Sequence, residues 1–176
     1  MADTISCPIP EDINPLSPNG FRFAITKLPE VSYFCQQVNL PGVMLGAPEV
    51  ANPFRLEPVP GESLTYDQLT VQFIVDSDLK NYRAIYNWLI ALGFPQDYEQ
   101  YKELVGDDDT KWTELSRNYS QATLQILGNT NNAIATVQFE DLFPMSLESL
   151  TLASTNMDVS YFVGSVTFRY GYYKFI

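Results

Sequence analysis

Histidine is absent from the 176-residue chain, and this absence argues against several kinds of chemistry at once. Histidine is the usual proton carrier at neutral pH, the usual base of a serine nucleophile and the commonest zinc ligand. The chain also lacks the G-x-S-x-G turn that presents a nucleophilic serine in many hydrolases. We therefore predict no catalytic residues, no cofactor and no metal site, and a protein that is not an enzyme.

Basic residues are scarce, with 10 Lys and Arg against 21 Asp and Glu and a formal charge of −11 at pH 7. An acidic surface repels phosphate backbones, so the composition argues against a protein that reads DNA sequence. The aspartates at 107–109, together with Glu114, suggest a calcium loop. Residues 110–112 do not fit the EF-hand pattern, and a solvated acidic loop is the better interpretation.

Cysteines and long apolar runs are also few. Cys7 and Cys35 stand alone rather than in a C-x-x-C pair, which predicts two free thiols and a reducing compartment. The longest apolar stretch, residues 84–94, is interrupted by Asn87 and Gly93. Residues 1–10 lack the basic and apolar regions of a signal peptide. We expect neither a secretion signal nor a membrane anchor.

Apolar and aromatic residues are plentiful, at 45% and 14% of the chain, and they suffice for a packed core. Four prolines among the first 18 residues exclude a helix or a central strand there. We expect residues 1–18 to form an extended arm and residues 19–176 to form a single β domain.

Alternating apolar residues predict strands in the first half of the chain. Residues 21–25 and 31–36 alternate on either side of a break at 28–30, which predicts two strands joined by a tight turn. Residues 69–75 form the clearest strand. The predicted core positions are Phe21, Phe23, Ile25, Leu69, Val71, Phe73 and Val75.

Further strands are predicted at 122–127, 133–139, 147–152 and 160–175, with a hairpin turn at 129–132. The total is seven or eight strands with one inserted helix. This pattern predicts a mainly β fold, a small antiparallel β-barrel or sandwich with one flanking α-helix.

The helix is predicted at 79–92, where apolar residues recur at helical spacing until Gly93 and Pro95 end it. Asp76 and Asp78 precede it, and their position favours helix caps over a carboxylate pair for acid–base chemistry.

Aromatic residues on and after this helix have two interpretations. Tyr82, Tyr86, Trp88 and Phe94 could stack on a ligand, or they could form the face by which the helix covers a sheet. The second is the more common arrangement. Apolar residues nevertheless extend almost all the way round the helix, which predicts that part of it contacts another subunit.

Short apolar pieces alternate with prolines and glycines between residues 41 and 60, which predicts a projecting hairpin or extended loop. Such segments gain order mainly by docking on a partner, so we expect this one and residues 1–18 to reach adjacent subunits. The aromatic-rich stretch at 160–175 is either a central strand or an edge strand that recruits a neighbour.

Seven short motifs occur in a characteristic order: residues 17–23 (S-P-N-G-F-R-F), 34–36 (F-C-Q), 40–43 (L-P-G-V), 59–62 (V-P-G-E), 69–73 (L-T-V-Q-F), the helical segment 82–88, and 142–144 (L-F-P). In this order the chain resembles the inner-tube proteins of contractile bacteriophage tails, a family that includes baseplate tube-initiator rings and related secretion-system tube proteins.

The resemblance implies a structural protein that forms hexameric rings, stacked into a hollow tube for DNA ejection. The implied partners are further copies of the chain, other tail or baseplate proteins, the tail sheath, and DNA that passes without sequence recognition. The implied location is the virion, after assembly in the host cytoplasm. The chain departs from the family pattern at 1–18, 48–60 and 106–112, which leaves open a repeated tube subunit or a terminal ring such as a baseplate initiator.

Two sets of residues are candidates for this assembly. An acidic bore would keep DNA mobile, and the candidate lumen residues are Glu62, Asp67, Asp107, Asp108 and Asp109. The candidate subunit-interface residues are Val43, Leu45, Phe54, Leu56, Trp88, Tyr170 and Tyr172.

The alternative function is a monomeric, jelly-roll-like β binding module for a small ligand or glycan.

Overall fold

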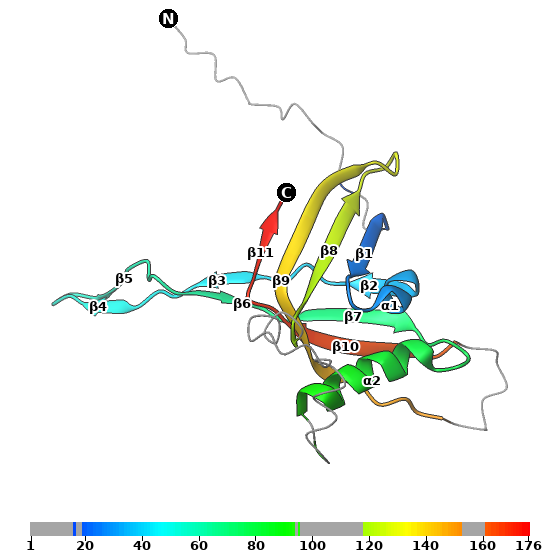
Figure 1. Cartoon of the computed structure of the whole chain (residues 1–176). Coiled ribbons are helices and arrows are strands. Elements are labelled where there is room, and N and C mark those ends of the chain that lie inside the picture. The colour runs from blue at the N-terminus through cyan, green and yellow to red at the C-terminus, as the bar shows by residue number, and fades with distance from the viewer. Residues whose placement is uncertain (1–15, 17–18, 94, 96–117, 153–160) are drawn as a thin grey trace, which may run out of the picture.

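Antiparallel strands make up most of the fold. The computed structural model describes residues 16, 19–93, 95, 118–152 and 161–176 (Figure 1). Every strand pairing in this part of the chain is antiparallel, and the predicted mainly β class with a flanking helix is confirmed. The elements are β1 (Phe21–Ile25), α1 (Pro29–Tyr33), β2 (Cys35–Val38), β3 (Val43–Leu45), β4 (Glu49–Ala51), β5 (Leu56–Pro58), β6 (Leu64–Tyr66), β7 (Leu69–Ile74), α2 (Lys80–Gly93), β8 (Ser120–Leu127), β9 (Ala133–Leu147), β10 (Val163–Arg169) and β11 (Tyr172–Phe175).

The main sheet has seven strands in the order β1-β8-β9-β10-β7-β2, with β11 also paired to β9. The long strand β9 joins its two halves. The first part of β9 pairs with β8 and β11, and residues 143–147 pair with β10. The two halves run in different directions (Figure 1), and the apolar faces of both meet in one core.

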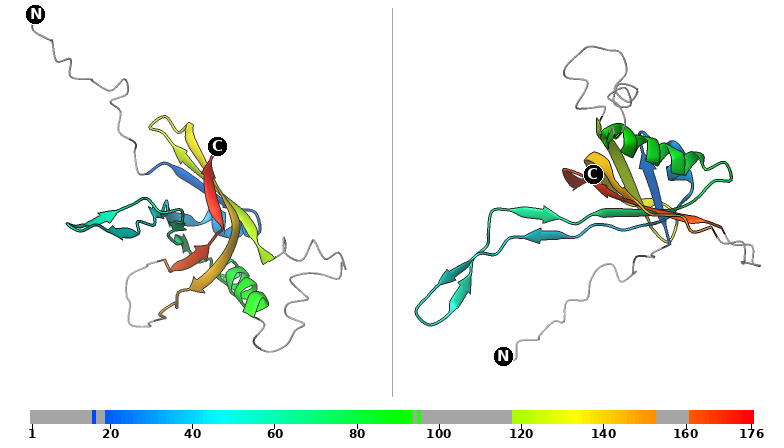
Figure 2. Two further views of the ribbon diagram at one scale, coloured as in Figure 1. Left: turned by 90° about the vertical axis from the view of Figure 1, so that its left-hand side faces the viewer. Right: turned by 90° about the horizontal axis from the view of Figure 1, so that it is seen from below.

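The core contains most of the predicted positions. Phe23, Ile25, Leu69, Val71 and Phe73 are buried, whereas Phe21 and Val75 are partly buried and pack against the core. Helix α2 lies against one side of the sheet (Figure 2). It contributes Ile85, Trp88 and Ala91 as buried apolar residues at helical spacing.

The predicted hairpin of residues 21–25 and 31–36 is wrong. Residues 29–33 form the short helix α1, β1 pairs with β8, and β2 pairs with β7. Pro29 suits the first turn of a helix, where its missing N–H costs nothing. Ser32 fixes the turn, because its hydroxyl accepts a hydrogen bond from the Ile25 N–H at 2.9 Å and donates one to the Leu28 carbonyl at 3.2 Å.

The C-terminal strands also differ from the prediction. Strand β9 continues to Leu147, and residues 148–152 form no strand. The stretch predicted as one strand at 160–175 is broken at Tyr170 and Gly171 into β10 and β11. Both pieces pair with β9 at different places. Asp141, which lies in β9 between its pairings with β11 and with β10, has a φ of 55°. The turn predicted at 129–132 is confirmed, with the Gly128 N–H donating to the Asn132 carbonyl at 2.8 Å.

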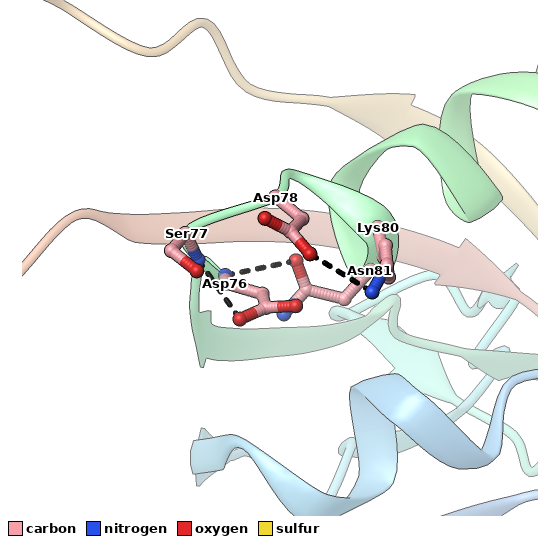
Figure 3. Close-up of polar contacts among 5 residues, drawn as sticks. All are labelled: Asp76, Ser77, Asp78, Lys80 and Asn81. Atoms are coloured by element: carbon pink, nitrogen blue, oxygen red, sulfur yellow. Dashed lines mark hydrogen bonds and ion pairs between the residues drawn. The ribbon is translucent and has the colours of Figure 1, made fainter.

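The connection from β7 to α2 depends on Asn81 rather than on the predicted aspartate caps (Figure 3). The buried Asn81 side chain accepts hydrogen bonds from the N–H groups of Asp76 and Tyr82 at 3.2 and 2.8 Å and donates one to the Ile74 carbonyl at 2.8 Å. The Asp76 carboxylate accepts from the Ser77 N–H, and Asp78 pairs with Lys80 at 2.9 Å.

Candidate assembly surfaces

An arm comprising residues 43–66 projects from the sheet in two tiers (Figure 2). Strands β3 and β6 pair in the first tier, and β4 and β5 pair in the second. The predicted projecting hairpin at 41–60 is thus confirmed, and it extends to Tyr66. The residues of β3, β4 and β5 are exposed throughout. Large apolar side chains are exposed along its whole length: Val43, Met44, Leu45, Val50, Phe54, Leu56, Val59 and Leu64.

The tip of the arm presents Phe54. Asn52 and Arg55 exchange backbone hydrogen bonds of 3.0 and 3.2 Å around it, which fixes a tight turn. The Phe54 side chain is 96% exposed. Arg55 and Glu57 form an exposed ion pair at 3.5 Å beside it. An exposed aromatic residue on a hydrogen-bonded turn is an arrangement typical of contact sites between proteins.

Tyrosines of the C-terminal segment hold the base of the arm. The Tyr170 hydroxyl donates a hydrogen bond to the Asp67 carbonyl at 2.8 Å, and the Tyr173 hydroxyl donates one to the Pro41 carbonyl at 3.2 Å. The ring of Tyr66 packs edge-on against Tyr170 and Tyr173, with ring centroids 5.9 and 5.6 Å apart. Burial raises the pKa of Tyr170 to about 12, so this hydroxyl stays protonated as a donor.

The structure separates the candidate interface residues into two groups. Val43, Leu45, Phe54 and Leu56 are exposed on the arm, and Tyr172 is 47% exposed on β11. Trp88 is 4% exposed and Tyr170 is 9% exposed, and both belong to the core of their own subunit. We correct the candidate set accordingly. The spacing of Trp88, three residues after Ile85 on the same helix face, is the sequence signal that indicates its burial.

The aromatic residues of α2 do not form a stacking platform. Trp88 packs against Phe168 with ring centroids 6.3 Å apart, and its indole N–H donates to the Asn118 carbonyl at 3.3 Å. Tyr82 is partly buried and donates a hydrogen bond to the Glu148 carbonyl. Tyr86 is exposed, and Phe94 lies outside the described residues. The interpretation that these aromatic residues form the face by which the helix covers a sheet is therefore correct for Trp88 and Tyr82.

The half-sheet β1-β8-β9-β11 has a polar face that no local sequence pattern indicates. Residues that alternate with the core positions share this face through the strand register. Glu140 is central to it, since its carboxylate accepts from Gln121 Nε2 at 2.7 Å and pairs with Lys174 Nζ at 3.0 Å. The polar face comprises Arg22, Ala24, Gln121, Thr123, Gln125, Thr136, Gln138, Glu140, Tyr172 and Lys174.

A groove of about 700 Å³ lies beside β1, lined by residues of β1, β8, α1 and β2 that include Arg22, Ala24, Ser32, Cys35 and Thr123. Cys35 is a free thiol, and burial raises its pKa to about 11. Cys7 lies outside the described residues.

Two of the five candidate lumen acids lie in the described part of the chain. Glu62 is exposed in the loop between β5 and β6, and Asp67 is exposed at the base of the arm. Asp107, Asp108 and Asp109 lie outside the described residues. Over the described part of the chain there is no group of acidic or cysteine side chains suited to a metal ion. None of the helices described here is long and apolar enough to cross a membrane.

A family model described as phage tail tube protein matches residues 14–176. The chain belongs to the phage tail tube protein family. A curated relative, the tail tube terminator protein of Enterobacteria phage T4, is 27% identical over 143 residues, which cover 79% of this chain and 74% of the relative.

Solved structures of contractile injection systems share the fold of this tail tube family member. The tube-terminating cap of the anti-feeding prophage matches with a TM-score of 0.64 at 12% identity, over 98% of each chain. A chain of the anti-feeding prophage baseplate matches with a TM-score of 0.64 at 11% identity, over 93% of this chain and 96% of that one. The predicted resemblance to tail tube proteins is thereby confirmed.

Proposed function

We propose that this protein is a ring-forming structural subunit of the inner tube of a contractile phage tail, and that its arm binds other copies. The exposed apolar arm carries this proposal. A two-stranded hairpin has no interior in which to bury apolar side chains, and patches of this kind mark contact sites. The tyrosines at its base hold the arm in a defined direction, which lowers the entropy lost on binding.

The position we propose within the tail is a terminal ring of the tube. The relative from phage T4 is by name a tube terminator, and the similarity covers most of both chains. A chain of the anti-feeding prophage cap shares the fold over its whole length. A repeated tube subunit and a baseplate tube initiator are the competing positions.

The polar face of β1-β8-β9-β11 is our proposed lining of the passage, with hexameric rings as the assembly. Amides and hydroxyls dominate this face. Its charged side chains are Glu140 and Lys174, which pair with each other, and Arg22. This replaces the expected acidic lining with a nearly neutral one. Neutral polar groups offer DNA phosphates few ionic contacts, so that DNA passes without sequence recognition.

Electron microscopy of the purified protein over a range of concentrations tests the proposal. A protein that forms a terminal ring should give discrete rings that do not stack into long tubes. The subunits in each ring can then be counted. Long tubes would instead indicate the repeated subunit. A protein that stays monomeric at every concentration, by sedimentation, would contradict ring formation and favour the monomeric binding module.

The arm has its own test. Deleting the second tier, residues 49–58, removes Phe54 and the exposed side chains of β4 and β5 without touching the core. We expect a folded protein with weaker assembly. The triple variant Val50→Ser, Phe54→Ser and Leu56→Ser keeps the length of the arm and serves as the matched control for side-chain chemistry. Wild-type assembly of both variants would contradict the proposed role of the arm.

A further inference from the structure

The strand register changes between the two tiers of the arm. In the first tier Leu45 is opposite Leu64, and in the second tier Glu49 is opposite Pro58. Four steps along the chain from Leu45 to Glu49 therefore correspond to six steps from Pro58 to Leu64. The second of these segments contains two extra residues, which makes the connection a β-bulge. We call residues 46–48 and 59–62 the joint of the arm.

Backbone hydrogen bonds close the joint on both sides of the extra residues. Towards the first tier, the Gly46 N–H donates to the Ser63 carbonyl at 2.9 Å, and the Gly46 carbonyl accepts from the Gly61 N–H at 2.7 Å. Towards the second tier, the Val59 N–H donates to the Pro48 carbonyl at 3.0 Å. The two tiers are therefore connected by a bonded structure and not by a loose link.

The two strands approach each other closely at Gly61. A Cβ atom at residue 61 would lie 2.5 Å from the Gly46 carbonyl oxygen and 3.1 Å from the Pro48 Cδ atom. Since that oxygen belongs to the backbone, a side chain at residue 61 would push the strands apart. A Cβ atom at residue 46 would lie 3.6 Å from the Ser63 carbonyl oxygen, an ordinary contact distance. Neither glycine has a φ in the left-handed region, so Gly61 is required for space alone.

Prolines restrict the backbone of the joint. Pro48 and Pro60 lie within it, and Pro58 ends β5 beside it. Each proline ring holds its own φ at about −65° and favours an extended conformation in the preceding residue. In the right-hand view of Figure 2 the second tier leaves the first in a different direction. The hydrogen bonds and the prolines together fix this direction in the single chain.

We propose that the joint positions the second tier of the arm for contact with other copies, and that its direction depends on Gly61. This inference rests on the proposed ring function and adds which residues set the geometry of the contact. Val50, Phe54 and Leu56 lie beyond the joint, so the bend decides where these exposed side chains are presented. A preset direction lowers the entropy that is lost on binding. The V-P-G-E motif at 59–62 is part of this joint.

Distances between spin labels measure the direction of the second tier. In a Cys7→Ser, Cys35→Ser background, the labels are attached at Asn87→Cys on the exposed side of α2 and at Arg55→Cys at the tip of the arm. A second pair, Asn87→Cys with Met44→Cys, reports on the first tier. Pulsed electron paramagnetic resonance of the dilute protein should give a narrow distance distribution for each pair.

Two variants change the joint. Deleting residues 60 and 61 removes the bulge, so that the two tiers continue as one regular ribbon and the tip moves. Gly61→Ala keeps the length of the arm and forces the strands apart. Both variants should shift or broaden the distance to the tip and leave the distance to the first tier unchanged. Each should raise the concentration needed for assembly by about tenfold, because the preset direction is lost.

Gly46→Ala is the matched control. It makes the same substitution in the same joint, at a position where the added atom has room. Its label distances and its assembly should match those of the unmodified protein. Chemical denaturation should show that the core is intact in all three variants, since the joint lies outside it.

The outcomes distinguish this inference from the ring function. A broad distance to the tip in the unmodified joint, or unchanged distances in both joint variants, would show that the bulge does not fix the direction. Wild-type assembly of a variant whose tip has moved, or equal losses of assembly in Gly46→Ala and Gly61→Ala, would also overturn the inference. In each case the ring function stands. Absence of rings in the unmodified protein would contradict the proposed function itself.

Discussion

Strand β7 in the sheet and the strands of the arm use apolar residues differently. On β7, Leu69, Val71 and Phe73 are fully buried and alternate with more exposed residues. On β3, β4 and β5 every residue is exposed, apolar and polar alike. Burial of apolar area stabilises the fold in the first case. On the arm the apolar area stays exposed, and the proposed function uses it for contacts between copies. The sheet should therefore determine stability, and the arm should determine assembly.

Phe73→Ala should have the largest effect on stability. Phe73 is fully buried in the core, and a phenylalanine deleted from such a site costs about 3–5 kcal/mol. Chemical denaturation measures the free energy of unfolding. A loss below about 1 kcal/mol would contradict the assignment of this face to the core.

Asn81→Ala should have the next largest effect on stability. It leaves the Asp76 and Tyr82 N–H groups and the Ile74 carbonyl without their side-chain partner near the start of α2. An unpaired backbone group costs about 1–3 kcal/mol when water cannot reach it. Ile74, Asp76 and Tyr82 are only half-buried, so water can replace part of the lost bonding, and we expect a total of about 2 kcal/mol. Asn87→Ala, on the exposed side of the same helix, is the control and should change stability by about 0.5 kcal/mol or less. Equal effects of the two variants in thermal denaturation would contradict the role of Asn81.

Tyr170→Phe should have a smaller effect, about 1 kcal/mol, because it removes one hydrogen bond at the base of the arm. It should also change the pH dependence. The pKa of Tyr170 rises from its usual value of 10.0 to about 12 in the fold, so its contribution is complete below pH 10 and is lost as pH rises to 12. Burial raises the pKa of Cys35 from 9.0 to about 11, which adds a loss between pH 9 and 11.

Denaturation between pH 8 and 12 checks this prediction. In a Cys35→Ser background, Tyr170→Phe should flatten the decline in stability above pH 10. If stability declines equally steeply in the Cys35→Ser protein with and without Tyr170→Phe, other groups cause the decline.

Phe54→Ala should have the smallest effect on stability, within about 0.5 kcal/mol, because its side chain is almost fully exposed. Its effect on assembly should be the larger one, measured by sedimentation at several concentrations. A marked loss of monomer stability would show that the arm belongs to the folding core, and the contrast between the two regions would fail.

Several features were predictable because they depend on short-range patterns. The alternation at 69–75 and the helical spacing at 79–92 correspond to β7 and α2, and the prolines and glycines at 41–60 predicted the projecting arm. Residues 31–36 show the limit of this reasoning. Their alternation suits a strand, but Pro29 and the Ser32 hydrogen bonds stabilise α1 instead.

The candidate assembly residues were predictable only in part. The apolar residues of the arm had no predicted core beneath them and are exposed, as expected. Trp88 and Tyr170 are also aromatic, but both are buried. The sheet covers Trp88, and the packing at the base of the arm covers Tyr170. The polar face was missed because its residues come from four strands, and only their register brings Gln121, Glu140 and Lys174 together.

The sequence by itself therefore determined the mainly β class, most of the core of β1 and β7, the flanking helix and the projecting arm, because periodicity and backbone restrictions act within a few residues. The tertiary structure alone decided which strands are neighbours, where the final strand breaks and which aromatic residues are buried. Those outcomes depend on pairing between residues far apart in the chain, for which a local pattern carries no information.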